Sequence, residues 1–218
     1  MKLRNVVIVD GMRSPFSWGG RGKFEATRLD DVAVIVLRTL MERNPKVNPT
    51  MVEDIGLGHW AAQPDICNIS TITRLGGFPE ETTGFVTNRE CGSSMDTLHR
   101  LATSIMVGAS DCAIALGVER TGRALAGAGH RVTDTPPDGE KRNNQQRDMA
   151  HDHDRYFSVP IPDAILDSPP QQSMPQTAQN VVDMYGIPRE ELDAFTVRSH
   201  HKLAAAYEAG IYKDEVVP

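Results

Sequence analysis

The sequence predicts an α/β fold, in which a mostly parallel sheet carries helices on both faces and is accompanied by a helical and irregular loop domain. Strand-like and helix-like segments alternate through residues 6–116, which is typical of parallel βα units. The apolar run at residues 113–116 is typical of a strand covered on both faces. After residue 119 the composition shifts to glycine, proline and polar residues. We therefore expect a βα region at residues 1–119 and a loop domain at residues 120–218.

The βα region is expected to contain four strands and three helices. The strands are predicted at residues 6–10, 54–60, 83–88 and 111–116. The helices are predicted at residues 29–43, 66–75 and 95–107. Each helix has a recognisable end signal: Asp30 or Asp31 starts the first, Gly76-Gly77 closes the second and Gly108 ends the third.

The loop domain is expected to be irregular over most of its length. Residues 133–154 are polar and contain the turn-forming run Pro136-Pro137-Asp138-Gly139. Two helices are predicted near its end, at residues 176–185 and 188–209. The second helix opens with Pro188 and has acidic residues in its first turn, as helix starts commonly do.

Composition excludes several classes of protein. The 218 residues carry a formal net charge of −6, which argues against a nucleic-acid partner because neutralising phosphates requires a basic surface. The three cysteines have no metal-type spacing, so we expect a reducing compartment, the cytoplasm. No apolar segment approaches the roughly 20 residues that span a bilayer, and the first residues leave no room for a signal peptide. No membrane insertion is expected.

Cys91 is the residue that most strongly indicates chemistry. It follows the strand predicted at residues 83–88 and precedes a clean helical pattern, so it lies at the amino end of a helix. Unpaired backbone N–H groups and the positive end of the helix dipole meet there, which favours a thiolate and can hold a developing oxyanion. Small residues follow it and leave the approach clear for a substrate. The alternative is a small core cysteine that merely precedes a helix.

Several segments resemble the thiolase family in order and spacing. The motif Asn88-x-x-Cys91-Gly92-Ser93-Ser94-Met95 is similar to the family's nucleophile motif, and its Ser-Ser-Met variant is most similar to the bacterial 3-ketoacyl-CoA thiolase of fatty-acid β-oxidation. Ser14 stands where the family's opening Arg-Thr-Pro turn has threonine, and Leu116 stands where its Gly-Gly-Val-Glu segment has a glycine. Further resemblance lies at residues 173–181, 185–195 and 209–218, so it covers nearly the whole chain.

The resemblance is to the amino-terminal half of a thiolase. The family's second half carries Asn-Glu-Ala-Phe, Gly-His-Pro and Cys-x-Gly motifs, and none of these occurs in the 218 residues. A fragment and a split enzyme are both open, and we favour one subunit of a split thiolase. A complementary chain is then expected to supply the catalytic histidine and second cysteine, in a dimer of such heterodimers.

The resemblance also implies a reaction and its residues. Cys91 would form an acyl-cysteine during thiolytic cleavage of a 3-ketoacyl-CoA, or in the reverse condensation of acetyl-CoA. Met174 matches the family's pocket methionine and would line the acyl pocket. Coenzyme A is expected as a substrate, with no cofactor. The alternative function is a non-catalytic subunit that binds or carries a CoA thioester.

No metal site is expected. Asp148, His151, Asp152, His153 and Asp154 crowd ligand-type side chains together, but their spacing matches no known ligand pattern, so a solvated loop is the better interpretation. Cys67 and Cys112 are expected in or near the core.

Overall fold

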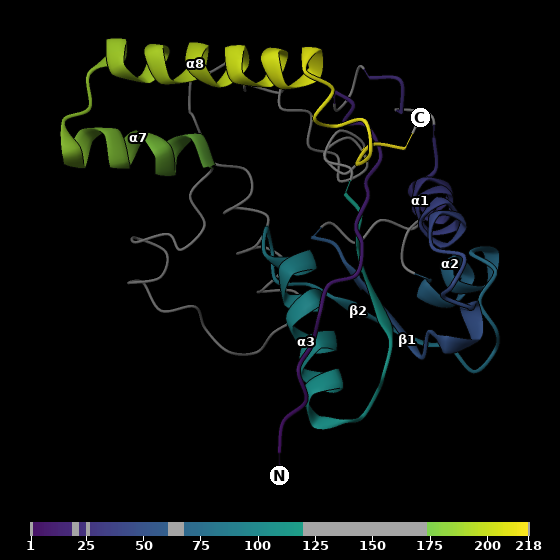
Figure 1. The fold of residues 1–218 in the computed structure, drawn as a ribbon. Coiled ribbons are helices and arrows are strands. Elements are labelled where there is room, and N and C mark those ends of the chain that lie inside the picture. The colour runs from purple at the N-terminus through teal and green to yellow at the C-terminus, as the bar shows by residue number, and fades with distance from the viewer. Residues whose placement is uncertain (1, 19–21, 25–26, 61–67, 120–173, 218) are drawn as a thin grey trace, which may run out of the picture. The chain divides into compact units, whose positions relative to one another are not determined.

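The computed structural model describes residues 2–18, 22–24, 27–60, 68–119 and 174–217 (Figure 1). The chain divides into two compact units, Met1–Arg131 with Tyr212–Pro218, and Val132–Ile211. Because residues 120–173 lie outside the described residues, the boundary at residue 119 stays a prediction.

The first unit is built on a three-stranded parallel sheet. Its strands are β1 (Asp54–Gly58), β2 (Thr83–Thr87) and β3 (Ala113–Gly117), in the order β2-β1-β3. Gly58 pairs with Thr87 on one side and with Gly117 on the other, so the three strands end at the same level. The segments that follow them therefore share one edge of the sheet, where sites form in parallel α/β folds.

Helices cover both faces of this sheet, as predicted (Figure 1). Helices α1 (Leu29–Arg43) and α2 (Ile69–Leu75) enclose the main core with Ile55 and Leu57 of β1, which are fully buried. Helix α3 (Ser93–Val107) lies on the opposite face, over Gly56 and Gly58. The predicted α/β class is thus confirmed. A short 3₁₀ helix, η1 (Pro49–Met51), precedes β1.

The end of α3 is as predicted, whereas the start of α1 differs from the prediction. Gly108 caps α3 in the left-handed conformation, with φ of 80°, as expected for a terminal glycine. Helix α1 is capped by Arg28, which makes no side-chain cap bond. Asp30 lies in the first turn, where Arg28 donates to its carboxylate at 2.9 and 2.6 Å. The hydrogen bond from Arg28 lowers the pKa of the Asp30 carboxyl.

The strand predicted at residues 6–10 is not observed. Val7, Ile8 and Val9 are 76–77% exposed, and no strand is assigned there. The physical reason is pairing: β1 bonds to β2 and β3, and within the described residues the segment at residues 6–10 joins none of these three strands, so it has no ladder of hydrogen bonds to complete a strand. A pattern of β-branched residues therefore indicates a strand here but cannot supply its partner.

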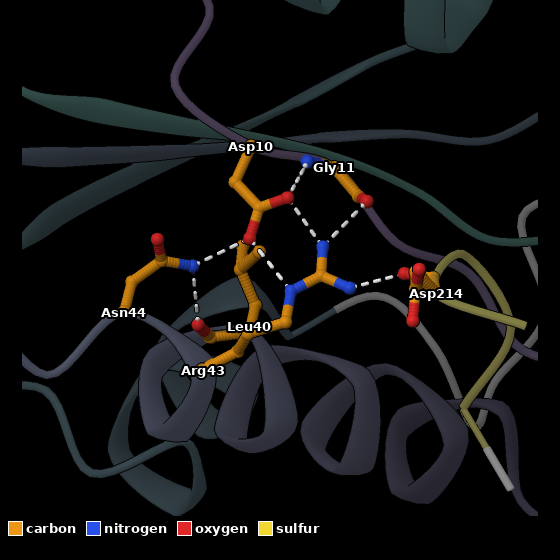
Figure 2. A network of polar contacts seen from close by, with 6 residues as sticks. All are labelled: Asp10, Gly11, Leu40, Arg43, Asn44 and Asp214. Carbon is orange, nitrogen blue, oxygen red and sulfur yellow. Dashed lines mark hydrogen bonds and ion pairs between the residues drawn. The ribbon is translucent and has the colours of Figure 1, made fainter.

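Polar contacts hold both ends of this exposed segment. At its start, the Arg4 N–H donates to the Met106 carbonyl at 2.9 Å. At its end, Asp10 accepts from the Arg43 Nε at 2.8 Å and from the Asn44 amide at 2.6 Å (Figure 2). Arg43 also donates to the carbonyls of Gly11 and Asp214, so it links the N-terminal segment to residues of the C-terminal stretch. These bonds to Arg43 and Asn44 lower the pKa of the Asp10 carboxyl to about 2.

Strand β3 differs from the expectation of a strand covered on both faces. Leu116 is buried, but Ala115 and Gly117 are exposed. β3 lies at an edge of the observed sheet, so its apolar run is covered less fully than a central strand's would be.

The second unit contains α7 (Met174–Tyr185) and α8 (Arg189–Glu208), close to the two predicted helices. Pro188 is the N-cap of α8, with Glu190 and Glu191 in the first turn, as the sequence indicated. No residue of α8 is buried among the described part of this unit. Across the described ranges, no helix is long and apolar enough to cross a membrane.

Candidate functional site

Cys91 lies at the shared edge where the strands end, in the short turn between β2 and α3. It is exposed, and α3 begins two residues later at Ser93, with Gly92 as the N-cap. Glu90, directly before it, has φ of 49°, which is a left-handed conformation that L-residues rarely adopt. The predicted position of Cys91 at the amino end of a helix is therefore observed, and the thiol is presented by an unusual backbone turn.

Ser93 supports this turn from inside the helix. Its Oγ accepts from the Arg89 N–H at 2.9 Å and donates to the Glu90 carbonyl at 2.6 Å, and the side chain is buried. The backbone N–H of Ser93 donates to the same Glu90 carbonyl at 3.1 Å. These bonds satisfy the polar groups of a tight turn and limit its movement.

Backbone donors remain available around the thiol. Within the described residues, the N–H groups of Cys91, Ser94 and Met95 have no hydrogen-bond partner, whereas the first intrahelical bond is made by Asp96 to the Gly92 carbonyl at 2.9 Å. Free N–H groups at a helix start can stabilise a negative charge, such as the oxyanion formed when a thiolate attacks a carbonyl.

Two glycines let α3 approach the sheet closely. A Cβ on Gly58 would lie 2.4 Å from the Ser94 nitrogen, and one on Gly117 would lie 2.6 Å from the Ser94 Cβ. The helix start therefore rests directly on the backbone of the strand ends. Glycine at these two positions sets the depth of the Cys91 turn relative to the sheet.

Charged residues surround the first turn of α3. Asp96 accepts from Arg100 at 2.7 Å and forms an ion pair with Arg89 at 3.0 Å. The hydrogen bond from Arg100 lowers the pKa of the Asp96 carboxyl. An anionic residue in the first turn also interacts favourably with the helix dipole. Arg89, next to Asn88, is thereby tied to the helix that follows the thiol.

Three further residues of this edge were not predicted as site residues. The Asn88 side chain donates to the Trp60 carbonyl and accepts from the Glu90 N–H. Glu119 accepts from the Trp60 N–H at 2.7 Å. His59 is 4% exposed, and neither ring nitrogen has a hydrogen-bond partner among the described residues. Its burial keeps the imidazole from direct contact with a substrate, so we assign it no step. The strand register could have located all three, since each follows a strand end.

The other predicted residues have mixed outcomes. Met174 is exposed at the start of α7 in the second unit, so its role in an acyl pocket stays a prediction. Cys112 is half-buried beside the core, and burial, followed by the charge of Glu53, raises the pKa of its thiol. Cys67 and the aspartate–histidine cluster at residues 148–154 lie outside the described residues.

Comparison with known proteins gives a consistent result. Residues 6–218 match the family model described as Thiolase, N-terminal domain. The 3-oxoadipyl-CoA/3-oxo-5,6-dehydrosuberyl-CoA thiolase of Escherichia coli (strain K12) is 34% identical over 219 residues, which cover 99% of this chain and 52% of that protein. The 3-ketoacyl-CoA thiolase of Aliivibrio salmonicida is 32% identical over 220 residues, covering 99% and 49%.

A solved structure agrees with these sequence matches. The crystal structure of the Bacillus anthracis acetyl-CoA acetyltransferase superposes with a TM-score of 0.73 at 28% identity, covering 100% of this chain and 51% of that one. The chain spans about half the length of the curated relatives it matches.

Proposed function

This chain belongs to the thiolase family, whose N-terminal domain it matches, and we propose that Cys91 is the nucleophile of an acyl transfer between CoA thioesters. The observation that carries the proposal is the exposed Cys91 thiol at the start of α3, beside backbone N–H groups that have no partner in the described part of the chain. A thiol and nearby oxyanion donors are what the first step of such a transfer requires.

The reaction proceeds in two steps. The Cys91 thiolate attacks the 3-keto carbonyl of a 3-ketoacyl-CoA, and the carbon–carbon bond then breaks, with its electron pair leaving on the acetyl-CoA carbanion, which takes up a proton. The acyl group remains on sulfur as a thioester. The thiol of a second CoA attacks that thioester, the bond between the acyl carbon and the Cys91 sulfur breaks, and the acyl group leaves as acyl-CoA while Cys91 is regenerated. The relatives named for 3-ketoacyl-CoA and 3-oxoadipyl-CoA thiolase activity support this substrate class. Coenzyme A is a substrate, and no cofactor is needed.

The site requires groups that the 218 residues do not carry. A base must take the proton of Cys91 and an acid must protonate the departing carbanion. The Asn-Glu-Ala-Phe, Gly-His-Pro and Cys-x-Gly motifs do not occur in the 218 residues. We propose that a complementary chain supplies the histidine and the second cysteine. The exposed apolar side chains of Val7, Ile8 and Val9 support the presence of a covering partner.

Acylation followed by mass spectrometry tests the nucleophile. The chain is incubated with acetyl-CoA or acetoacetyl-CoA, with and without a candidate chain that carries the two missing motifs, and the acylated peptide is identified. We expect acyl transfer to Cys91 in the complex, loss of it in Cys91→Ser, and retention in the matched variant Cys112→Ser. Acylation that persists in Cys91→Ser would refute the assignment.

Steady-state kinetics and light scattering test the assembly. Thiolytic cleavage is expected from the mixture and not from the chain by itself, and the mixture is expected to form a heterotetramer of two chains of each kind. Full activity of the chain by itself would contradict the proposal of a shared site.

The alternative is a subunit that binds or carries a CoA thioester without reacting with it. It predicts saturable binding of acetyl-CoA with no acylation of Cys91 under any condition. The presence of an exposed cysteine at the helix start favours catalysis over this alternative.

A further inference from the structure

We propose that Asn88 is a positioning residue that fixes the Cys91 turn to the neighbouring strand end. The inference rests on the proposed role of Cys91 and adds a residue that acts on the thiol through the backbone. Asn88 Nδ2 donates to the Trp60 carbonyl at 2.9 Å, and Asn88 Oδ1 accepts from the Glu90 N–H at 3.1 Å. We call these two hydrogen bonds the Asn88 bridge.

The bridge connects segments that follow two different strands. Trp60 follows β1 and Asn88 follows β2, and the strands are in register through Gly58 and Thr87. The His59 N–H donates to the Thr87 carbonyl at 3.2 Å, which brings Trp60 level with the Asn88 side chain. One exposed amide therefore spans the gap between the end of β1 and the turn that presents the thiol.

Trp60 is itself held, so the bridge has a fixed anchor. Its N–H donates to Glu119 Oε2 at 2.7 Å, and the Val118 N–H donates to the Gly58 carbonyl at 3.2 Å. Both partners belong to the segment that follows β3. Hydrogen bonds thus join the ends of all three strands in a row. The Asn88 bridge ties the Cys91 turn to this row.

The backbone of Glu90 explains why an anchor is needed. Its φ of 49° is unfavourable for a residue with a side chain. Hydrogen bonds on both sides offset that cost: Asn88 Oδ1 accepts from the Glu90 N–H, and Ser93 Oγ donates to the Glu90 carbonyl. Without the Asn88 bond, the turn can relax toward ordinary dihedral angles, which moves the Cys91 sulfur relative to the free N–H groups at the helix start.

This role predicts a selective defect. Acylation by an ester needs both the sulfur and the oxyanion donors in place, whereas alkylation by iodoacetamide needs only an accessible sulfur. A positioning residue should therefore affect the first reaction much more than the second. A general loss of structure would change both reactions together.

The experiment measures both reactions at Cys91 in the full chain, resolved by peptide mass spectrometry, with p-nitrophenyl acetate as the acyl donor. In Asn88→Ala we expect acylation to slow by about tenfold or more, because small misplacements of reacting groups are costly. Alkylation should stay within about twofold of the unaltered chain. Asn48→Ala is the matched control: Asn48 is also exposed and accepts from the Thr50 N–H at 3.0 Å, but it lies before β1. It should leave both rates unchanged.

Asn88→Asp separates the two halves of the bridge. It keeps an acceptor for the Glu90 N–H and removes the donor to the Trp60 carbonyl. We expect slow acylation with normal protection of the Glu90 amide in hydrogen exchange. In Asn88→Ala that amide should exchange about five- to tenfold faster, as expected for the loss of one hydrogen bond.

Four results would overturn the inference: native acylation in Asn88→Ala, native acylation in Asn88→Asp, an equal effect of Asn48→Ala, or native exchange of the Glu90 amide in Asn88→Ala. If the unaltered chain is not acylated at Cys91 even in the presence of the complementary chain, the proposed function fails instead. The exchange of the Glu90 amide then still decides whether the bridge exists.

Discussion

Gly58→Ala is expected to displace the start of helix α3. An added Cβ would lie 2.4 Å from the Ser94 nitrogen and 2.5 Å from both the Ser93 carbonyl carbon and the Ser94 Cα. Ordinary contact begins near 3.4 Å, so the start of α3 must retreat by about 1 Å. All three neighbours are backbone atoms, which cannot rotate away as the end of a side chain could.

The magnitude follows from this overlap. Overpacking a close-packed site typically costs about 1–3 kcal/mol of unfolding free energy, and a rigid backbone contact places Gly58 near the upper value. A displacement of about 1 Å at a reacting group can lower its rate by about 100-fold. We therefore expect a loss of about 3 kcal/mol in urea unfolding and about 100-fold slower acylation of Cys91 by p-nitrophenyl acetate.

Two variants serve as comparators for this result. Gly56 lies on the same face of β1, but a Cβ there would meet side-chain atoms of Thr97 and Phe85. Gly56→Ala should therefore lower the free energy of unfolding but slow the acylation of Cys91 less than Gly58→Ala does. Gly11 has nothing within 4 Å and no positive φ, so Gly11→Ala should stay within about 0.5 kcal/mol of the unaltered chain. A Gly58→Ala chain with unchanged stability and acylation would refute the close approach of α3.

Three other variants or reactions test separate parts of the first unit. Asp10→Asn should lower the free energy of unfolding at neutral pH, because it removes the ion pair with Arg43. The loss should be only about 1 kcal/mol, because solvent screens this partly exposed pair. Since the folded pKa of Asp10 is lowered to about 2 from 3.8, this difference should be present above pH 3.8 and vanish as the pH falls toward 2; a pH-independent difference in urea midpoints would contradict it. Ser93→Ala should cost about 1–2 kcal/mol in the same assay, because the Arg89 N–H loses its acceptor, and a neutral effect would show that the turn does not depend on this hydroxyl. Iodoacetamide should modify exposed Cys91 faster than half-buried Cys112 at neutral pH, because burial raises the pKa of the Cys112 thiol; faster labelling of Cys112, read by peptide mass spectrometry, would contradict the burial of that side chain.

Much of the local structure was predictable from the sequence. Helix α1 has the predicted bounds, because its apolar spacing and its stop at Asn44-Pro45 are both local signals. Helix α3 was also predicted with its glycine end, and Cys91 was placed correctly at its start. Strands β1, β2 and β3 were predicted to within two residues at each end, since short segments that contain apolar residues and are bounded by turn residues are local features.

The segment at residues 6–10 shows that a local sequence pattern does not determine strand pairing. Its residues have the composition of a strand, yet Val7, Ile8 and Val9 are exposed, because the segment pairs with none of the three described strands. Strand formation depends on a partner that lies elsewhere in the sequence. The same holds for Asn88: its motif was recognised, but the Trp60 carbonyl that it bonds lies 28 positions away.

The sequence by itself determined the α/β class, the family resemblance and the identity of Cys91 as the candidate nucleophile, because spacing and motif are written along the chain. Only the tertiary structure decided which strands pair, how closely α3 rests on Gly58, and how Asn88 joins the Cys91 turn to the end of β1. These features depend on register and on approach between segments distant in sequence. The chemistry expected of Cys91 is therefore read from local residues, while its position is set by contacts that only folding creates.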